Sequence, residues 1–371
     1  MSIKEDLSNY KMDRGKRPGK FLGMLNNTMY MDLSEIIRAH ALPFLPAKSL
    51  FRFKSVCRDW KLQISTPFFA HNQSICCVST LGFFRQVSGE PPSLVSDDPE
   101  ACGVPDPSLN FLPEPVGIVS ASNGLICCHS QIGSKAYYIC NPVTQQWKKL
   151  PEPNANHGLQ PSVVLIYEPS RLNFEADYKL VCAFPSADFD DATEFEIYSS
   201  KEGSWKVSGE ISFTSYSVQT KSGVHVNGVV YWKSRGLLAY DLTKDRSQML
   251  QDYQFGNGVL GAMNGKLCSA YPNGQAIAVQ VLANAHSNTM QMSSHARMWA
   301  EKQRVVLDKE VVGGAVSELA VVAASGNKLL VQLARRLYVY DLLTKETKAL
   351  GIASAGRDTR YIPYVNSLVS L

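Results

Sequence analysis

The chain has 371 residues, 45% of them hydrophobic, and a net charge of only +4, values that are ordinary for a soluble protein with one large or two modest domains. No apolar run approaches the length needed to cross a bilayer, and the charges between Lys4 and Asp13 interrupt the N-terminus before a signal-like apolar core forms. We therefore expect an intracellular protein, in the cytoplasm or the nucleus, and exclude the membrane and secreted classes.

Residues 1–30 are predicted to form a basic, disordered tail. The first twenty residues carry six basic and three acidic side chains, so they supply +3 of the net charge, and they include Gly15, Pro18 and Gly19. The remainder of the chain is close to neutral, and its aromatic residues are not interleaved with basic ones. The charge therefore does not predict a nucleic-acid-binding surface.

Residues 31–72 are predicted to form a small helical module. Apolar side chains recur at helical spacing from Leu50 to Ile64, which predicts one helix with an apolar face. Pro46 is expected to begin a short helix, because its fixed φ suits a first turn. Helices of about ten residues cannot bury a core alone, so the module must pack on the rest of the chain or on a partner.

This segment resembles an F-box. The resemblance is carried by Leu33, Leu45–Leu50, Phe51–Lys54 and Val56–Trp60, although Ser34 stands where F-boxes usually have proline and Pro43 falls inside the expected first helix. It implies that the module docks a Skp-family adaptor. The residues that the resemblance assigns to this contact are Leu33, Ile37, Leu45, Pro46, Leu50, Phe53, Val56, Cys57 and Trp60.

Residues 73–371 are predicted to form an all-β domain, because short β-rich runs divided by Gly, Pro, Asn and Asp begin at about Ile75. Ser88–Pro115 holds seven prolines and is predicted to be a long loop. The chain ends in Tyr361–Leu371, which has strand composition. We expect this segment to pair near Ile75–Val78 or with a neighbouring strand, and so to close the domain.

Internal repeats predict the architecture. Three strand-turn-strand units contain Thr144, Thr243 and Thr344, which lie 99 and 101 positions apart, and an intermediate copy at Glu196–Ser200 brings the period near fifty. Hairpin turns are predicted beside the units at Asn123-Gly124, Asn227-Gly228, Asn264-Gly265 and Gly326-Asn327. Four short strands in about fifty residues is the pattern of a propeller blade, so residues 74–371 predict about six blades.

This region resembles the kelch-like, F-box-associated domains of plant proteins. The residues that carry the resemblance include Ser122–Ile126, Cys140–Thr144, Tyr178–Val181 and Val226–Trp232, while the double glycine of kelch repeats occurs only at Gly313-Gly314. The fold expected for the whole chain is therefore mainly β, with a small N-terminal α module of short F-box helices followed by a kelch-like β-propeller.

Neither a metal nor another cofactor is predicted. The nine cysteines are odd in number and lie in apolar segments, which favours reduced core thiols. Cys127-Cys128-His129 are consecutive strand residues and cannot all reach one ion, and the histidines show no metal-ligand spacing.

No catalytic residue is predicted either. The acidic group Asp188, Asp190, Asp191, Glu194 and Glu196 is interpreted as a solvated loop rather than a carboxylate pair for acid–base chemistry. Trp147, Trp205 and Trp232 are interpreted as blade-packing residues. Candidate target-binding loops are Ser88–Pro115, Asp188–Glu194 and Asn284–Ser294, and the substrate-binding residues themselves are not identified.

Two functions remain open. The first is a non-catalytic substrate receptor of an SCF-type ubiquitin ligase, in which the F-box binds a Skp-family adaptor, the adaptor joins a cullin scaffold, and the propeller binds an unidentified protein target. The second is an F-box interaction protein that acts as a binding scaffold without a cullin complex, an alternative that Ser34 and Pro43 leave open.

Overall fold

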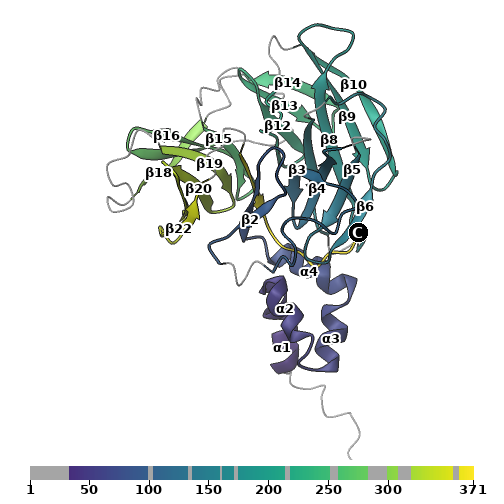
Figure 1. Cartoon of the computed structure of the whole chain (residues 1–371), viewed down its shortest axis with the longest axis vertical. Coiled ribbons are helices and arrows are strands. Elements are labelled where there is room, and N and C mark those ends of the chain that lie inside the picture. The colour runs from purple at the N-terminus through teal and green to yellow at the C-terminus, as the bar shows by residue number, and fades with distance from the viewer. Residues whose placement is uncertain are drawn as a thin grey trace, which may run out of the picture. The chain divides into compact units, whose positions relative to one another are not determined.

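The computed structural model describes residues 33–98, 103–132, 136–158, 161–170, 174–213, 218–250, 258–282, 299–307, 319–353 and 359–371 (Figure 1). The chain divides into two compact units, Met1–Ala41 and Leu42–Leu371. The first contains helix α1 (Leu33–His40). The predicted tail, the Asn284–Ser294 loop and Gly313-Gly314 lie outside the described residues.

The second unit begins with four short helical segments: η1 (Leu42–Phe44), α2 (Ala47–Phe53), α3 (Arg58–Ile64) and α4 (Pro67–Cys76). Pro46 occupies the N-cap of α2 with φ −65°, so the predicted helix start is confirmed. The prediction of one continuous helix from Leu50 to Ile64 is wrong, because two separate helices, α2 and α3, occupy this range. Cys57 has an extended backbone and caps α3, its sulfur accepting the N–H of Trp60 at 3.4 Å.

Two further sequence expectations are corrected by the helices. Helix α1 ends at His40, so Pro43 does not interrupt it and lies in η1 instead. Ile75 and Cys76 belong to the last turn of α4, so no strand begins there. The first strand of the β part is β1 (Gly82–Gln86).

The β part consists of five sheets, in which neighbouring strands are antiparallel except for one parallel pair (Figure 1). One four-stranded sheet holds β3 (Val116–Ser122), β4 (Leu125–Ser130), β5 (Tyr137–Asn141) and β6 (Gln146–Lys149). The next holds β7 (Ser162–Tyr167), β8 (Tyr178–Pro185), β9 (Ala192–Ser199) and β10 (Ser204–Phe213). A third holds β11 (Val224–Val226), β12 (Val229–Lys233), β13 (Leu237–Asp241) and β14 (Arg246–Leu250).

An eight-stranded sheet follows, composed of two four-stranded meanders. The first meander is β15 (Val259–Met263), β16 (Lys266–Asn273), β17 (Ala276–Leu282) and β18 (Trp299–Val306). The second is β19 (Leu319–Ser325), β20 (Lys328–Leu333), β21 (Arg336–Asp341) and β22 (Thr347–Ile352). A single parallel pair, Ala262 with Ser325, joins them.

The remaining sheet is built from both ends of the β part. It has the order β2-β1-β23, where β2 is Ser93–Val95 and β23 is Arg360–Tyr364, and β1 pairs with β23 from Gly82–Tyr364 to Gln86–Arg360. Pairing of the C-terminal strand with an N-terminal one is thus confirmed, but the partner is β1 and not Ile75–Val78. Strand β2 lies within Ser88–Pro115, which is therefore not wholly a loop.

The innermost strands form a closed ring. Strands β3, β7, β11, β15, β19 and β23 each lie beside the next, and β23 lies beside β3. The described residues thus form a propeller-like ring of five hydrogen-bonded sheets. The predicted count of about six blades differs somewhat from the observed sheets, because two four-stranded meanders share one eight-stranded sheet and the closing sheet has three strands.

The core lies between neighbouring sheets. Four of the five described clusters of buried apolar side chains join one sheet to the next, as when Leu125 and Ile139 of one sheet pack with Leu165 and Leu180 of the following one. The other cluster joins the two meanders of the eight-stranded sheet. Trp205 and Trp232 are buried in these layers, which confirms their packing role. Trp147 does not have this packing role, because its side chain is 43% exposed on the outer strand β6.

The turns that define the repeat are confirmed. Asn227 and Gly228 have φ values of 50° and 81°, and the pairs at 123–124 and 264–265 are similar, as a two-residue turn of this type requires. In the repeated units Asp241 and Asp341 accept backbone N–H groups two and three residues on. These side chains hold the turn by local hydrogen bonds.

Candidate interaction surfaces

The helical module is held together by a ring contact between α2 and α3. Phe53 and Trp60 meet edge to face with centroids 5.4 Å apart, although they are no longer on one helix. The break at Cys57 turns α3 back so that the two aromatic rings contact each other. A contact of this kind adds roughly 0.5–1.5 kcal/mol beyond the area that it buries.

The residues assigned to the adaptor contact fall into three classes of exposure. Leu33 in α1 and Val56 and Cys57 between α2 and α3 are exposed, whereas Leu50 is completely buried. We therefore assign Leu50 to packing and not to a binding surface. The partly exposed members are Ile37, Leu45, Pro46, Phe53 and Trp60.

Sequence reasoning missed five exposed apolar side chains of the module, and two of them, Ile36 and Phe68, lie in α1 and α4. Phe44, Phe51 and Leu62 are all exposed, yet none lies on the apolar face predicted for a continuous helix. Phe44 ends η1, Phe51 lies in α2 and Leu62 lies in α3. The extended N-cap position of Cys57 carried no strong signal in the sequence, because cysteine is not among the preferred N-cap residues.

The last helix and the C-terminal segment fasten the module to the propeller. The N–H of Ala47 donates to Asn366 Oδ1 at 3.4 Å, and the N–H of Leu368 donates to Gln73 Oε1 at 3.3 Å. The ring of His71 in α4 packs edge-on against Tyr167 at the end of β7. Helices α2 and α4 therefore lie on the side of the ring where the inner strands end.

This side is the module rim, which we define as the turns that follow the inner strands: 123–124, 227–228, 264–265 and 326–327. Two of these turns are in contact, since Asn227 Nδ2 donates to the carbonyl of Gly265. The N–H of Gly326 donates to the carbonyl of Ala262 in β15. The opposite side is the far rim, defined as the segments that precede inner strands, namely Gln219–Gly223, Gly258 and Thr359.

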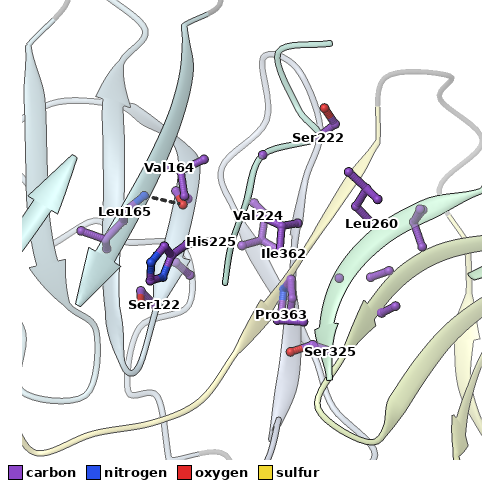
Figure 2. A pocket seen from close by; sticks show the side chains of 18 of the residues that line it. Ser122, Val164, Leu165, Ser222, Val224, His225, Leu260, Ser325, Ile362 and Pro363 are labelled. Carbon is purple, nitrogen blue, oxygen red and sulfur yellow. Dashed lines mark hydrogen bonds between the residues drawn. The ribbon is translucent and has the colours of Figure 1, made fainter. Parts of the chain in front are cut away.

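A channel of about 620 Å³ runs inside the ring between the two rims. All six inner strands contribute to its wall. Figure 2 shows Leu165 of β7, His225 of β11, Leu260 of β15 and Ile362 of β23 around it. Its walls combine apolar side chains with serines and with the cations Lys233 and Arg360. This volume lies in the range of small-molecule pockets, about 300–1,000 Å³.

The acidic group at 188–196 is not one solvated loop. Asp188, Asp190 and Asp191 are exposed as predicted, but Glu196 in β9 is completely buried. Its Oε2 lies 2.7 Å from His157 Nε2, and its oxygens accept the N–H groups of Asn154 and Ala155. The prediction for Glu196 is therefore wrong.

The surroundings of Glu196 lower the pKa of its carboxyl group. Burial alone would raise the pKa of Glu196, but the hydrogen bonds from His157, Asn154 and Ala155 outweigh burial and lower it. His157 Nδ1 lies 2.9 Å from the hydroxyl of Tyr137, so the network continues into β5. All three side chains are buried between two blades, and the network joins the 151–158 connection to both of them.

The described cysteines lie mostly in strands and carry no disulfide. Of the eight that the structure covers, six are buried, one is partly exposed and Cys57 is exposed. Burial holds the pKa of Cys127 and Cys182 well above its ordinary value, so these thiols stay protonated. The prediction of reduced core cysteines is confirmed for these positions.

In the described ranges, no three His, Cys, Asp or Glu side chains are arranged so that they could hold a metal ion. Within the same ranges, none of the helices is long and apolar enough to span a membrane.

The ring of sheets defines the fold class of the protein. A closed ring of sheets, in which one sheet pairs the first strand of the β part with the last, defines a β-propeller protein. Residues 111–313, more than half of the chain, match the family model described as "F-box protein At3g26010-like, beta-propeller". The chain belongs to this family.

Its relatives include F-box proteins of Arabidopsis thaliana. F-box protein At5g49610 is 32% identical over 58% of this chain and 63% of its own length, and F-box protein At5g07610 is 27% identical over 80% of this chain and 75% of its own length. A putative F-box/kelch-repeat protein, At1g15680, is 29% identical over 47% of this chain and 46% of its own. The chain thus covers less than two thirds of the first of these relatives.

Among solved structures, the chain is similar to the dihydro-heme d1 dehydrogenase NirN in complex with DHE, with a TM-score of 0.33 and 15% identity over 66% of this chain and 58% of that one. The expected identity as a plant F-box protein with a C-terminal propeller, and the expected mainly-β fold, are confirmed by the family match and the relatives.

Proposed function

We propose that this protein is the substrate receptor of an SCF-type ubiquitin ligase. The helical module docks a Skp-family adaptor, the adaptor joins a cullin, and the propeller binds a target protein. The observation that carries the proposal is the family membership together with apolar side chains exposed on the module. The F-box relatives support a substrate-adaptor role for the chain.

The exposed surface of the module fits a protein partner. Phe44, Phe51, Val56 and Leu62 are all exposed within one short stretch of the chain, and we infer that they contribute to a partner-binding surface. Residues 42–64 also carry five basic side chains against one acidic one, Asp59. A partner that presents an acidic rim around an apolar centre would therefore match this surface in charge.

The far rim is the side that we propose for target binding. The module rim is already covered by α4 and the C-terminal segment, through the contacts of Gln73 and Asn366. The far rim is bordered by the exposed β8–β9 turn at 188–191, because β8 runs opposite to the inner strand β7. In the Ser88–Pro115 excursion, by contrast, Gly103 lies against Lys48 on the module side.

In this function no residue of the chain makes or breaks a covalent bond. The receptor would hold a target lysine close to the ubiquitin thioester of the conjugating enzyme. Tethering converts a bimolecular encounter into an intramolecular one with a millimolar or higher effective concentration, which accelerates transfer. The far rim lies opposite the turns beside α4, so a target bound there would not be covered by α4 or the C-terminal segment.

Replacing Val56 with glutamate is expected to weaken adaptor binding by about tenfold or more, equivalent to about 1.4 kcal/mol. Val56 is 59% exposed, so a charge there does not disturb the fold but would be buried against the partner. The matched control is Val306→Glu in β18, since Val306 is 67% exposed on the propeller. Binding is measured by calorimetry with a purified plant Skp-family adaptor.

Two outcomes would contradict the proposal. Equal affinities for the Val56→Glu and Val306→Glu proteins would show that the adaptor does not use this surface. Failure of the unmodified protein to bind any Skp-family adaptor would favour the scaffold function that needs no cullin complex.

A further inference from the structure

Two phenylalanine side chains of the sheet β7–β10 form an exposed pair, which we call the aromatic corner. Phe189 lies in the β8–β9 turn and Phe213 ends β10, and their rings meet edge to face with centroids 5.6 Å apart. Phe189 is 48% exposed and Phe213 is 70% exposed. Because the two rings contact each other and remain exposed, they form one small apolar surface rather than two isolated residues.

The aromatic corner lies at the far-rim end of its sheet. Strand β8 runs opposite to the inner strand β7, so the turn that follows β8 lies at the end where β7 begins. Phe213 pairs with Ala192, the first residue of β9, which places the end of β10 at the same end. Since β10 is the edge strand, no further strand of this described sheet covers Phe213 on its outer side.

The β8–β9 turn holds Phe189 in place. The hydroxyl of Ser186 accepts the N–H groups of Asp188 and Phe189, each at 3.2 Å, and donates to the carboxylate of Glu194. A surface whose side chains are already ordered loses little conformational entropy on binding. The ring of Phe189 is therefore prepared for a contact before a partner arrives.

The chain around the aromatic corner is acidic. Residues 180–200 contain no Lys, Arg or His, and residues 214–217, which follow β10, contain no charged side chain. The turn itself exposes three carboxylates that belong to no ion pair among the described residues: Asp188, Asp190 and Asp191. The apolar pair thus has a negatively charged border, and a basic partner would complement it.

We propose that the aromatic corner binds a basic segment of the target protein, in which arginine side chains flank an apolar one. The apolar side chain packs on the two rings. A guanidinium group suits both neighbours of that contact, because it pairs with a carboxylate through two parallel hydrogen bonds and also stacks on an aromatic face. The inference rests on the proposed receptor function only in calling the partner a target, and it adds the chemistry of that partner.

The test measures binding of short fluorescein-labelled peptides to the isolated full-length chain by fluorescence anisotropy at low salt. The probe alternates arginine with leucine. One comparison peptide has glutamate in place of arginine, and the other has serine in place of leucine. We expect the probe to bind, both comparison peptides to bind about tenfold more weakly or less well still, and added salt to weaken binding of the probe.

Substitutions in the aromatic corner test the residues. Phe189→Ser and Phe213→Ser are each expected to weaken binding of the probe by about tenfold or more, as for aromatic residues that anchor an interface. The double variant Asp190→Asn, Asp191→Asn is expected to weaken it about threefold and to reduce its salt dependence. Asparagine tolerates the positive φ of 58° at position 191, so this variant keeps the turn.

The matched control is Leu343→Ser in the β21–β22 turn. Leu343 is 71% exposed, like Phe213, but its turn lies beside the module-rim turn at 326–327, where the N–H of Leu342 donates to the carbonyl of Asn327. Leu343→Ser is expected to bind the probe as the unmodified protein does. Because both substituted side chains are exposed, the thermal midpoints of Leu343→Ser and Phe213→Ser should stay close to that of the unmodified protein.

The peptide test fails independently of the proposed function, because it contains no adaptor. A chain that binds a Skp-family adaptor but not the probe refutes the aromatic corner alone. A chain that binds the probe but no adaptor refutes the receptor function and leaves the aromatic corner as a protein-binding site.

Four results would overturn the proposal. These are absence of probe binding at millimolar concentration, equal binding of the glutamate peptide, equal binding by Phe213→Ser and the unmodified protein, and self-association of the chain that Phe213→Ser abolishes. The last result would show that a second copy of the chain covers the aromatic corner. If a phenylalanine variant melts far below the unmodified protein, the aspartate variant decides, since it keeps both rings and unchanged binding by it would contradict the charge-based contact.

Discussion

Deletion of residues 361–371 is expected to abolish the cooperative unfolding transition of the propeller near its normal midpoint. Strand β23 pairs along its length with β1, and Tyr361, Ile362 and Tyr364 are buried. Leu368 and Val369 beyond the strand are buried as well. Each such side chain contributes about 1.5–3 kcal/mol, so their sum is comparable to the whole stability of a domain, about 5–15 kcal/mol.

The deletion would also remove hydrogen bonds that the C-terminal segment makes. Asn141 Nδ2 donates to the carbonyls of Ser367 and Val369, so the C-terminal segment also connects to the first complete blade. Differential scanning calorimetry of the deletion and of the full chain measures the effect. The control lacks only Ser370 and Leu371, which lie beyond the buried segment, and is expected to keep most of the midpoint.

A milder change tests the same closure without removing a strand. Gly124 has φ +92°, and a Cβ built on it would lie 2.2 Å from the Cβ of Ser367. Gly124→Ala therefore combines a strained turn with a clash against the C-terminal segment.

If the 361–371 deletion melted at the midpoint of the full chain, the ring would not depend on this seam and the closure argument would fail.

Glu196→Ala is expected to lower the free energy of unfolding by about 3–5 kcal/mol, because it breaks a buried pair and leaves its partners unsatisfied. His157 Nε2 and the N–H groups of Asn154 and Ala155 would all lose their acceptor. The matched control is Glu202→Ala, an exposed glutamate on the following turn, which should change stability by less than about 0.5 kcal/mol. Urea titration at pH 7 measures both variants.

The contribution of Glu196 depends on pH in a definite direction. Its folded-state pKa lies below the ordinary value of 4.5, so the unfolded chain takes up the proton first as the pH falls. The stabilisation is complete above about 4.5 and is lost as the pH drops through the lower folded pKa. The stability difference between the unmodified protein and Glu196→Gln should therefore shrink below pH 4.5, and a difference independent of pH would contradict this assignment.

The sequence by itself determined the features that depend on short-range chemistry. Asn-Gly at 123–124, 227–228 and 264–265 predicts the positive φ values that each turn adopts, because few other pairs adopt them at low cost. Asp241 and Asp341 hold their turns through hydrogen bonds to residues two and three positions away. The repeat period, the mainly-β class and the blade-like strand order follow from these local units.

Only the tertiary structure decided which distant segments meet. Strand composition was equally good at Ile75–Val78 and at β1, but pairing with β23 required β1, since Ile75 belongs to α4. Glu196 resembles its exposed acidic neighbours in the sequence, and its burial follows from the 151–158 connection packing over it. The exposure of the module's apolar side chains and the positions of the channel cations likewise depend on contacts between residues far apart in the chain. No local sequence pattern predicts such contacts.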